Sequence, residues 1–308
     1  MITISTIMSV YNENIKWIEE AIYSIINQSY QDWELIIIID NPELENEKKT
    51  FLEKMARKEK RIILLYNQKN LGLAQSLNKG IEIAKGKYIA RMDADDVAIP
   101  ERFERELNFI QKENADMVST NAIYIDENSV ELKKGSPIEK NPEKKLIYTN
   151  TIIHPSVMMN KSSLAEVGGY RNFRKSQDYD LWLRMLSSGM KIRCLNEYLM
   201  KYRIRTSSLS NSCRLEQYYF NLYQKRLYKQ RIKNGTDSFS EYNLQKYIKQ
   251  KHITSWKNIR CLKCMEELEK TKAKMKNKEI SFIIHYIKAF IIFPTIAFRA
   301  AINMVKKI

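Results

Sequence analysis

Glycine, proline and cysteine are scarce in this chain. Eight Gly and six Pro among 308 residues argue against an all-β protein built from short strands and many turns. Four Cys are too few for a disulfide framework in a chain of this size, so we expect a reducing, cytoplasmic setting. Cys261 and Cys264 form a C-x-x-C pair, but a structural zinc site needs four ligands and the sequence has no second pair. We therefore interpret them as two thiols on one helix.

The N-terminal segment lacks the features of a signal peptide. The stretch MITIST has no basic head and passes directly into a strand-like alternation, so we expect no leader. A hydrophobic fraction of 44% and four Trp allow a sizeable core. The length allows one large domain with an appendage, or two modest domains.

Acidic residues are scarce after residue 200. Residues 201–308 contain 24 Lys and Arg against 7 Asp and Glu, whereas residues 1–200 contain 28 against 29. A neutral body therefore carries a strongly basic tail. Basic tails bind nucleic acid or anionic membrane surfaces, and the charge alone does not decide between the two.

Strand-like and helix-like segments alternate over the first 200 residues, which predicts an α/β fold with a doubly wound, mostly parallel central sheet flanked by helices. The predicted strands are 2–10, 33–40, 61–66, 87–93 and 115–126. The predicted helices are 15–27, 48–58, 72–84 and 100–112, followed by one that begins near residue 179. After residue 201 we expect basic helices over 213–232, 242–251 and 265–278.

Polar side chains follow three of the predicted strands. The turn Ser9–Glu13, Asp40 and the cluster Asp93, Asp95 and Asp96 each lie at the carboxyl end of a strand. Parallel sheets bind their ligands beyond these ends, so we expect the three segments to meet in one crevice. Three carboxylates so close together repel one another. A divalent cation, a basic substrate or a well-hydrated turn would each resolve that repulsion.

Five segments occur in an order and at a spacing typical of one enzyme family. They are SVYNE (9–13), IIIID (36–40), NLGLAQSLNKGIEIAKGKYIARMDADDVAIPER (70–102), HPSVMMNKSSLAEVGGY (154–170) and SQDYDLWLRM (176–185). Together they resemble the family 2 glycosyltransferases, inverting enzymes of the GT-A fold that use nucleotide-sugars. The resemblance covers residues 1 to about 210 and implies a catalytic domain over 1–210. A basic helical extension over 211–280 and an interfacial helix over 281–308 would follow it.

On the donor side, the resemblance implies that four residues line the pocket for the nucleotide base and ribose: Val10, Tyr11, Glu13 and Asp40. Asp93 and Asp95 would form the D-x-D pair, with Asp93 near the ribose. Asp95, with Asp93, would hold the Mn²⁺ or Mg²⁺ that bridges the diphosphate of a donor that is UDP-linked by family prevalence. Such a cation stabilises charge on the leaving phosphate. The role of Asp96 stays open.

On the acceptor side, Asp178 matches the catalytic base of the family, and His154, Gly169 and Tyr170 match the acceptor wall. The acceptor hydroxyl needs a carboxylate within hydrogen-bond reach to take its proton, and one direct displacement inverts the anomeric centre. Acids also favour helix starts, and we interpret Asp180 in that way.

The chain departs from the family pattern at four positions. Ser9 stands where Pro is usual, and Asn41 stands where a second acid is common, which weakens any role for Asn41. Gln177 replaces the usual Glu beside the base. Arg205 replaces a His that can approach the metal; it would either contact the diphosphate directly or be a surface residue.

Residues 281–306 form an apolar stretch with few charges. On one helix, with a kink expected at Pro294, the polar residues would fall on a narrow stripe: Ser281, His285, Lys288, Thr295, Arg299, Asn303 and Lys306. Such a helix lies in the membrane interface, because spanning would place two charges in hydrocarbon at roughly 2.5–3.5 kcal/mol each. The alternative is packing on the protein or on a second copy, which would make a homo-oligomer.

We therefore expect a peripheral enzyme on the inner face of the cell membrane, with an anionic membrane surface as a partner. It would transfer sugar to a glycan or polyprenyl-linked saccharide, with no nucleic acid partner. Two alternatives remain. A sugar-nucleotide pyrophosphorylase would need a Gly-rich basic loop after its first strand, and SVYNE is neither. A nucleic-acid-binding protein would show salt-sensitive retention on DNA or RNA that does not depend on Asp95 or Asp178.

Overall fold

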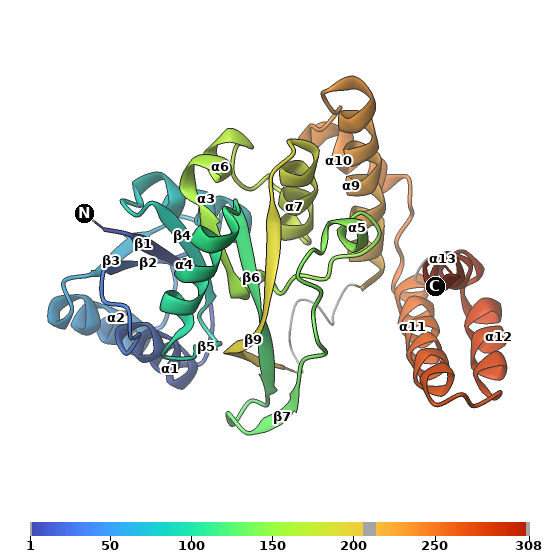
Figure 1. The fold of residues 1–308 in the computed structure, drawn as a ribbon, viewed down its shortest axis with the longest axis horizontal. Helices are drawn as coiled ribbons and strands as arrows, with labels where there is room; N and C mark the ends of the chain where they lie inside the picture. Colours follow the sequence, from blue (N-terminus) through green and yellow to red (C-terminus); the bar gives the residue numbers. More distant parts are fainter. Residues whose placement is uncertain (1, 206–213, 306–308) are drawn as a thin grey trace. The chain divides into compact units, whose positions relative to one another are not determined.

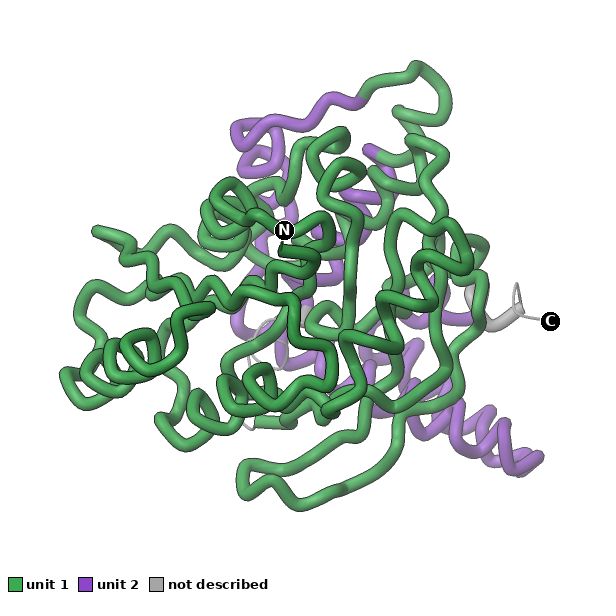
Figure 2. Tube along the Cα trace, turned by 60° about the vertical axis from the view of Figure 1, so that its left-hand side comes forward, with its two compact units in different colours: residues 1–205, 228–236 green, residues 206–227, 237–308 purple. Residues whose placement is uncertain are grey.

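The computed structural model describes residues 2–205 and 214–305, with side chains throughout except at 214 and 302–305 (Figure 1). The chain divides into two compact units (Figure 2). The first contains residues 1–205 and 228–236, and the second contains 206–227 and 237–308. The finer division into three parts with boundaries at 210 and 280 stays a prediction.

Among the described residues, the strands of the first unit form one nine-stranded sheet. Their bounds are Ile4–Val10 (β1), Trp33–Ile39 (β2), Ile62–Tyr66 (β3), Tyr88–Asp93 (β4), Val97–Ala98 (β5), Met117–Ile125 (β6), Glu131–Lys134 (β7), Val157–Asn160 (β8) and Ile192–Arg203 (β9). The strand order is β3-β2-β1-β4-β8-β6-β9-β5, with β7 paired to β6. The helices of this part are Ile15–Ile26 (α1), Asn46–Lys58 (α2), Leu73–Ile83 (α3), Arg102–Glu113 (α4), Glu143–Leu146 (α5), Lys161–Glu166 (α6) and Gln177–Ser187 (α7).

The α/β class is confirmed, but the sheet is mixed rather than mostly parallel. β3, β2, β1 and β4 run parallel, as predicted. β8 lies between β4 and β6 and is antiparallel to both. β5 pairs antiparallel with β9, and β7 pairs antiparallel with β6. The sequence pattern did not predict β8, because a strand of four residues is too short to show a period of two.

Both faces of the sheet are covered by helices. Met8 and Ile37 pack with the apolar sides of α1, α2 and α4, whereas Ile7 and Ile38 pack with α3, α6 and α7 on the other face. All seven residues of β2 are buried, which is why its apolar residues form a continuous run rather than an alternation.

The register of the parallel strands brings their carboxyl ends to one edge. Val10 pairs with Ile39 and Ser9 pairs with Asp93. The Asp40 N–H donates a hydrogen bond of 2.8 Å to the Val10 carbonyl oxygen. The predicted meeting of the three polar strand ends is therefore confirmed, and this edge positions the candidate site.

The second unit is helical. Its helices are Arg214–Asn234 (α9, which ends in the first unit), Glu241–Lys249 (α10), Ser255–Lys276 (α11), Phe282–Ile292 (α12) and Pro294–Val305 (α13). α11, α12 and α13 share a small core that includes Cys261 and Cys264. Both are buried on α11, which confirms that the C-x-x-C pair lies on one helix.

The single helix predicted over 281–306 is wrong, because the chain forms two helices there. Phe293 leaves the helical region at φ −150° and ψ 84°, and Pro294 opens α13. Proline lacks an N–H and clashes with the preceding turn, so it starts a helix more easily than it continues one. The predicted stripe is thus divided between two helix axes, and Asn303 and Lys306 lie outside the described side chains. Within the described residues, no helix combines the length and hydropathy needed to cross a bilayer.

Candidate active site

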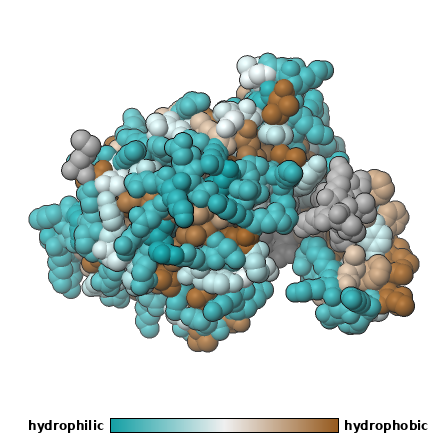
Figure 3. Space-filling model, in the orientation of Figure 1, coloured by the Kyte–Doolittle hydropathy of each residue, from teal (hydrophilic) through white to brown (hydrophobic). Residues whose placement is uncertain are grey.

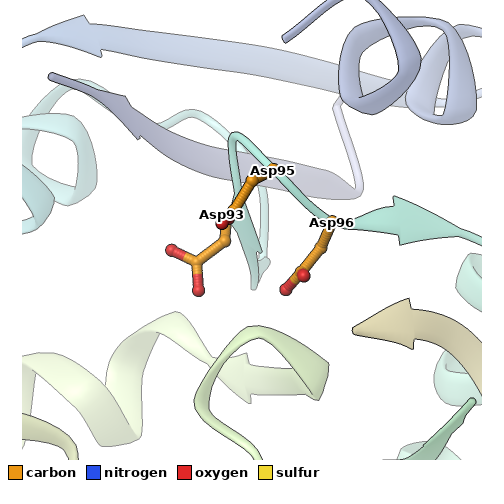
Figure 4. Close-up of side chains that lie close together, drawn as sticks. All are labelled: Asp93, Asp95 and Asp96. Atoms are coloured by element: carbon orange, nitrogen blue, oxygen red, sulfur yellow. The ribbon is translucent and has the colours of Figure 1, made fainter. Parts of the chain in front are cut away.

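The turn after β4 gathers three aspartates (Figure 4). Carboxylate oxygens of Asp93, Asp95 and Asp96 all lie within 4.8 Å of one another. Asp93 ends β4, and the chain turns at once into the short strand β5. Asp95 and Asp96 are only 7% and 1% exposed, so a merely hydrated surface turn does not account for the cluster. Such closely spaced charges need positive partners.

Arginines of the chain supply part of that positive charge. Arg91 lies two residues before Asp93 on β4, is 2% exposed, and forms an ion pair with the Asp93 carboxylate. Nε of Arg205 lies 2.8 Å from Oδ2 of Asp95. Arg205 therefore contacts the aspartate cluster, with its side chain 24% exposed, and its contact with a diphosphate stays a prediction.

Arg203, at the end of β9, holds the cluster from a third direction. Its backbone N–H donates to Oδ1 of Asp96 at 2.8 Å, and its Nε donates to the Asp95 carbonyl oxygen at 2.7 Å. The same guanidinium forms an ion pair of 2.6 Å with Glu20 of α1 and lies over the ring of Trp17. One buried side chain thus ties the aspartate turn to α1.

The arginines neutralise only part of the negative charge of the aspartate cluster. Burial and the neighbouring Asp93 raise the pKa of Asp95 to about 7, and burial with Asp95 raises the pKa of Asp96 well above its usual value. Among the described residues, the buried Oδ2 atom of Asp96 has no hydrogen-bond partner. Clustered carboxylate oxygens with unmet charge are the donors that Mg²⁺ and Mn²⁺ prefer, so the residues fit such an ion.

The loop after β1 is fixed by its own side chains. Val10 is fully buried, while Tyr11 is 47% exposed at the edge of the sheet. Oε2 of Glu13 accepts hydrogen bonds from the N–H groups of Tyr11 and Asn12, at 2.8 and 3.2 Å. Asn41 donates to the Tyr11 carbonyl oxygen at 3.0 Å. The exposed Tyr11 ring therefore projects from a braced loop, and the nucleotide roles of these residues stay predictions.

Asp40 anchors the loop that precedes α3. Its Oδ1 accepts from Nδ2 of Asn67 and from the Leu71 N–H, both at 2.8 Å. Its Oδ2 accepts from the Gly72 N–H at 2.9 Å, and Gly72 has a φ of +82° that favours glycine. Asp40 is 3% exposed, so these hydrogen bonds give it a structural role, and its nucleotide role stays a prediction.

Asp178 lies in the first turn of α7. Its Oδ2 accepts a hydrogen bond of 2.6 Å from Nδ2 of Asn150. Burial raises the pKa of Asp178, while the Asn150 hydrogen bond and the Arg91 charge oppose that rise. Arg91 thus acts on both Asp93 and Asp178. A buried carboxylate with a raised pKa is suited to accept a proton.

Asp180 also lies in the first turn of α7, as expected, but its carboxylate has another task. It is fully buried, and its Oδ2 lies 2.8 Å from Nε of Arg184, one helical turn later. The same guanidinium donates to the carbonyl oxygens of Val167 and Gly169. Asp180 therefore lies at the helix start, as predicted, and it also fixes Arg184 against the turn at Gly169.

The turn at Gly169 and Tyr170 is held from a second side by Asn78 of α3. The Asn78 amide accepts from the Tyr170 N–H at 2.8 Å and donates to the Tyr170 carbonyl oxygen at 2.7 Å. Gly169 has a φ of +63°, and a Cβ there would lie 2.7 Å from Oδ1 of Asn78. Only glycine fits this close approach.

His154 lies against that turn. Its Nε2 is 2.9 Å from the Tyr170 hydroxyl, and its ring contacts the rings of Tyr170 and Trp182 edge to face. Burial and the Arg91 charge lower the pKa of His154 well below its usual value, so the imidazole is neutral at pH 7. The three residues predicted on the acceptor side are thus brought together.

Sequence reasoning missed the side chains that position the site. Arg91 had a visible signal, since it is a charge inside the apolar strand YIARMD directly before an acid. Asn78 and Arg184 lie inside the segments that carry the family resemblance, without any pattern that shows their partners. Asn150 and Arg203 had no signal, because their contacts join residues far apart in the chain.

The fold has solved counterparts. The structure is similar to that of S. aureus TarS residues 1–349 in complex with UDP-GlcNAc, with a TM-score of 0.62 over 81% of this chain and 71% of that chain. The TarS 1–349 complex with UDP is similar at a TM-score of 0.59. Sequence identity is 16% in both cases, so the likeness concerns the fold alone. It defines a mixed α/β fold with one central sheet flanked by helices.

Sequence comparison gives the family. The profile described as Glycosyl transferase family 2 matches residues 5–168. A glycosyltransferase of Methanocaldococcus jannaschii, MJ1057, is 37% identical over 207 residues, covering 65% of this chain and 70% of that protein. The O-antigen biosynthesis glycosyltransferase WbnJ of Escherichia coli is 34% identical, covering 68% of this chain and 82% of WbnJ. The chain belongs to family 2 of the glycosyltransferases and is a transferase enzyme.

Proposed function

We propose that this enzyme transfers a sugar from a nucleotide-sugar, UDP-linked, to a hydroxyl of a glycan, with inversion at the anomeric centre. The observation that carries the proposal is the buried aspartate cluster at the shared edge of β1, β2 and β4. In a family 2 fold, this edge is where a nucleoside diphosphate would bind. The solved complexes of TarS with UDP and UDP-GlcNAc support the choice of donor.

Asp93 and Asp95 would hold Mn²⁺ or Mg²⁺, and when bound that ion would act as a Lewis acid toward the leaving diphosphate. Arg205 would contact the diphosphate directly, since its guanidinium already lies 2.8 Å from Asp95. Tyr11 and Glu13, with Asp40 behind them, would border the base and ribose. The donor would thus bind at the carboxyl ends of β1, β2 and β4.

Asp178 would take the proton of the acceptor hydroxyl as that oxygen attacks the anomeric carbon. Asn150 holds Oδ2 of Asp178 at 2.6 Å and orients the carboxylate. The neutral His154, with Tyr170, would form the wall that positions the acceptor. One attack on the face opposite the leaving group inverts the centre and needs no second, nucleophilic carboxylate.

The acceptor class follows from relatives and from charge. WbnJ of E. coli and the amylovoran glycosyltransferase AmsE of Erwinia amylovora both act in polysaccharide biosynthesis by name. A polyprenyl-linked saccharide is such an acceptor, and it would place the reaction at the inner face of the cell membrane. The 24 basic residues of 201–308 suit the negative surface of that leaflet.

The test compares Asp95→Asn and Asp178→Asn with a matched Asp32→Asn control. Asp32 directly precedes β2 and lies at the opposite edge of the parallel strands. We expect the control to keep its transferase activity with a panel of UDP-sugars. Each site variant should lose a hundredfold or more in kcat, which is about the rate contribution of a positioned base or electrophile. Chelation with EDTA should reproduce the Asp95→Asn loss, and product analysis should show inversion.

Two outcomes would contradict the proposal. Full activity of Asp178→Asn would place the base elsewhere. Salt-sensitive retention on DNA that is unchanged by either site variant, together with no sugar transfer, would favour the nucleic-acid-binding alternative.

A further inference from the structure

The outward side of α12 is almost entirely apolar. We call its exposed apolar residues the α12 outer face: Ile283, Ile284, Ile287, Phe290 and Ile291. Ile284, Ile287 and Ile291 are 57%, 51% and 69% exposed. Lys288 is the one exposed polar residue among the described side chains of this helix. Figure 3 shows the hydrophobic surface that gathers here.

The opposite side of α12 faces the core of its own unit. Ala289 is fully buried, together with residues of α11 and α13. Nδ1 of His285 lies 2.7 Å from Oε2 of Glu267 on α11. Tyr286 and Ile292 of the same helix also pack inward. The helix is therefore apolar on its outward side as well, where a surface helix of a soluble protein is usually polar. The unit does not use this apolar surface itself.

Basic residues outnumber acidic ones in the helices around this surface, with ten Lys and Arg against four Asp and Glu over residues 255–305. Residues 280–308 contain no Asp or Glu. Lys288 and Lys263 border a hollow of about 360 Å³ beside Ile291, which Glu266 and Glu267 also line. Glu267 is already paired with Lys270 and His285. An apolar strip with lysines at its margin is the arrangement of helices that lie in an anionic interface, where long basic stems reach the headgroups.

We propose that the α12 outer face inserts into the surface of an anionic lipid bilayer and fixes the enzyme there. The inference rests on the membrane location proposed above, and it names the residues that make the contact. A second copy of the chain suits the face less well. In a two-fold interface the same patch meets itself, which would bring the basic margins of the two copies together.

The experiment is vesicle flotation of the full chain with phosphatidylcholine alone and with phosphatidylcholine and phosphatidylglycerol at 3:1. The test variant is Ile284→Ser/Ile287→Ser/Ile291→Ser. Its matched control is Val130→Ser/Leu132→Ser/Ile232→Ser, three apolar residues of the first unit that are 58%, 54% and 61% exposed. We expect the test variant to lose more than tenfold in partitioning to anionic vesicles, and the control to bind like the parent.

A second pair tests the charge. Lys288→Glu should lower partitioning at least fivefold, about the effect of one basic residue near an anionic surface, whereas Lys54→Glu on α2 should not. Unchanged flotation of the triple isoleucine variant, or equal binding to neutral and anionic vesicles, would overturn the proposal. So would a change of oligomeric state in sedimentation velocity without a change in flotation. Because flotation needs no sugar transfer, failure of the proposed reaction would be seen separately.

Discussion

The Arg91 charge acts on both the aspartate turn and the acceptor side of the site. Arg91 is buried in β4 and pairs with Asp93. Its charge lowers the pKa of Asp178, which burial raises. The same charge lowers the pKa of His154, which burial also lowers. A buried arginine is retained only where carboxylates compensate it. The aspartate turn and Arg91 therefore stabilise one another.

Replacing Arg91 by Met should destabilise the protein by about 3 kcal/mol, because it leaves Asp93 without its buried partner. The measurement is chemical unfolding of the full chain. Arg105→Met is the matched control, since the pair of Arg105 with Glu197 is solvent-exposed and its loss should lower stability much less. Equal losses for the two variants would show that Arg91 does not stabilise the aspartate turn in this way.

The pH dependence of turnover should report Asp178. Burial raises its pKa, and the base works only in its ionised form. Activity should therefore fall as pH decreases, starting above the usual range of an aspartate, near pH 4. The profile of kcat/KM against pH checks this, and an acidic limb at or below the ordinary aspartate value would contradict it. The control is unfolding at the same pH values, which separates titration from loss of fold.

At the scale of elements, the turn between α6 and α7 offers a matched pair of glycines. Gly168 and Gly169 both have positive φ, but only at Gly169 would a Cβ meet a neighbour, 2.7 Å from Oδ1 of Asn78. Alanine at either position is strained by about 1 kcal/mol or more. Gly169→Ala should in addition displace the Asn78 side chain and its two hydrogen bonds with the Tyr170 backbone, which we call the Asn78 clamp.

We therefore expect Gly168→Ala to lower stability modestly with an unchanged acceptor KM, and Gly169→Ala to lower stability further and raise the acceptor KM. Unfolding curves and acceptor titrations at saturating donor make the comparison. If both variants changed the acceptor KM equally, the Asn78 clamp would not be what positions the acceptor wall.

The C-terminal helices show why an element cannot be predicted from periodicity alone. Placing residues 281–306 at 100° per residue assumes a single helix axis. The break at Phe293 separates two helices with different axes, so the angles calculated before and after it cannot be combined. His285, predicted on a water-facing stripe, instead pairs with Glu267 of α11. The sequence predicted the apolar character of this helix, but which of its sides faces outward depends on its packing against α11.

At the scale of the whole molecule, donor binding should stabilise the folded state. A ligand at about a hundred times its Kd adds about 2.7 kcal/mol, which corresponds to a Tm increase of about 5 °C or more for a domain of this size. We expect this shift from UDP with Mn²⁺ and a smaller one from UDP alone. A shift that is the same with and without Mn²⁺, or the same in Asp95→Asn, would contradict the proposed metal site.

The sequence by itself determined the α/β class, the four parallel strands β1 to β4 and the family. Strand and helix periods are local, and a run such as residues 35–39 has one stable place, buried on both faces. The aspartates that end β4 and the apolar character of α12 were visible in the same way. Their chemistry follows from residue types and short spacings.

Only the tertiary structure decided the mixed order of the sheet, the partners of the aspartates and the outward side of α12. Arg203 is 107 residues from Asp96, and β8 enters between β4 and β6 from a later part of the chain. Such contacts are set by the packing of whole layers, since a side chain's partner depends on which strand is placed beside it. No local pattern carries that information.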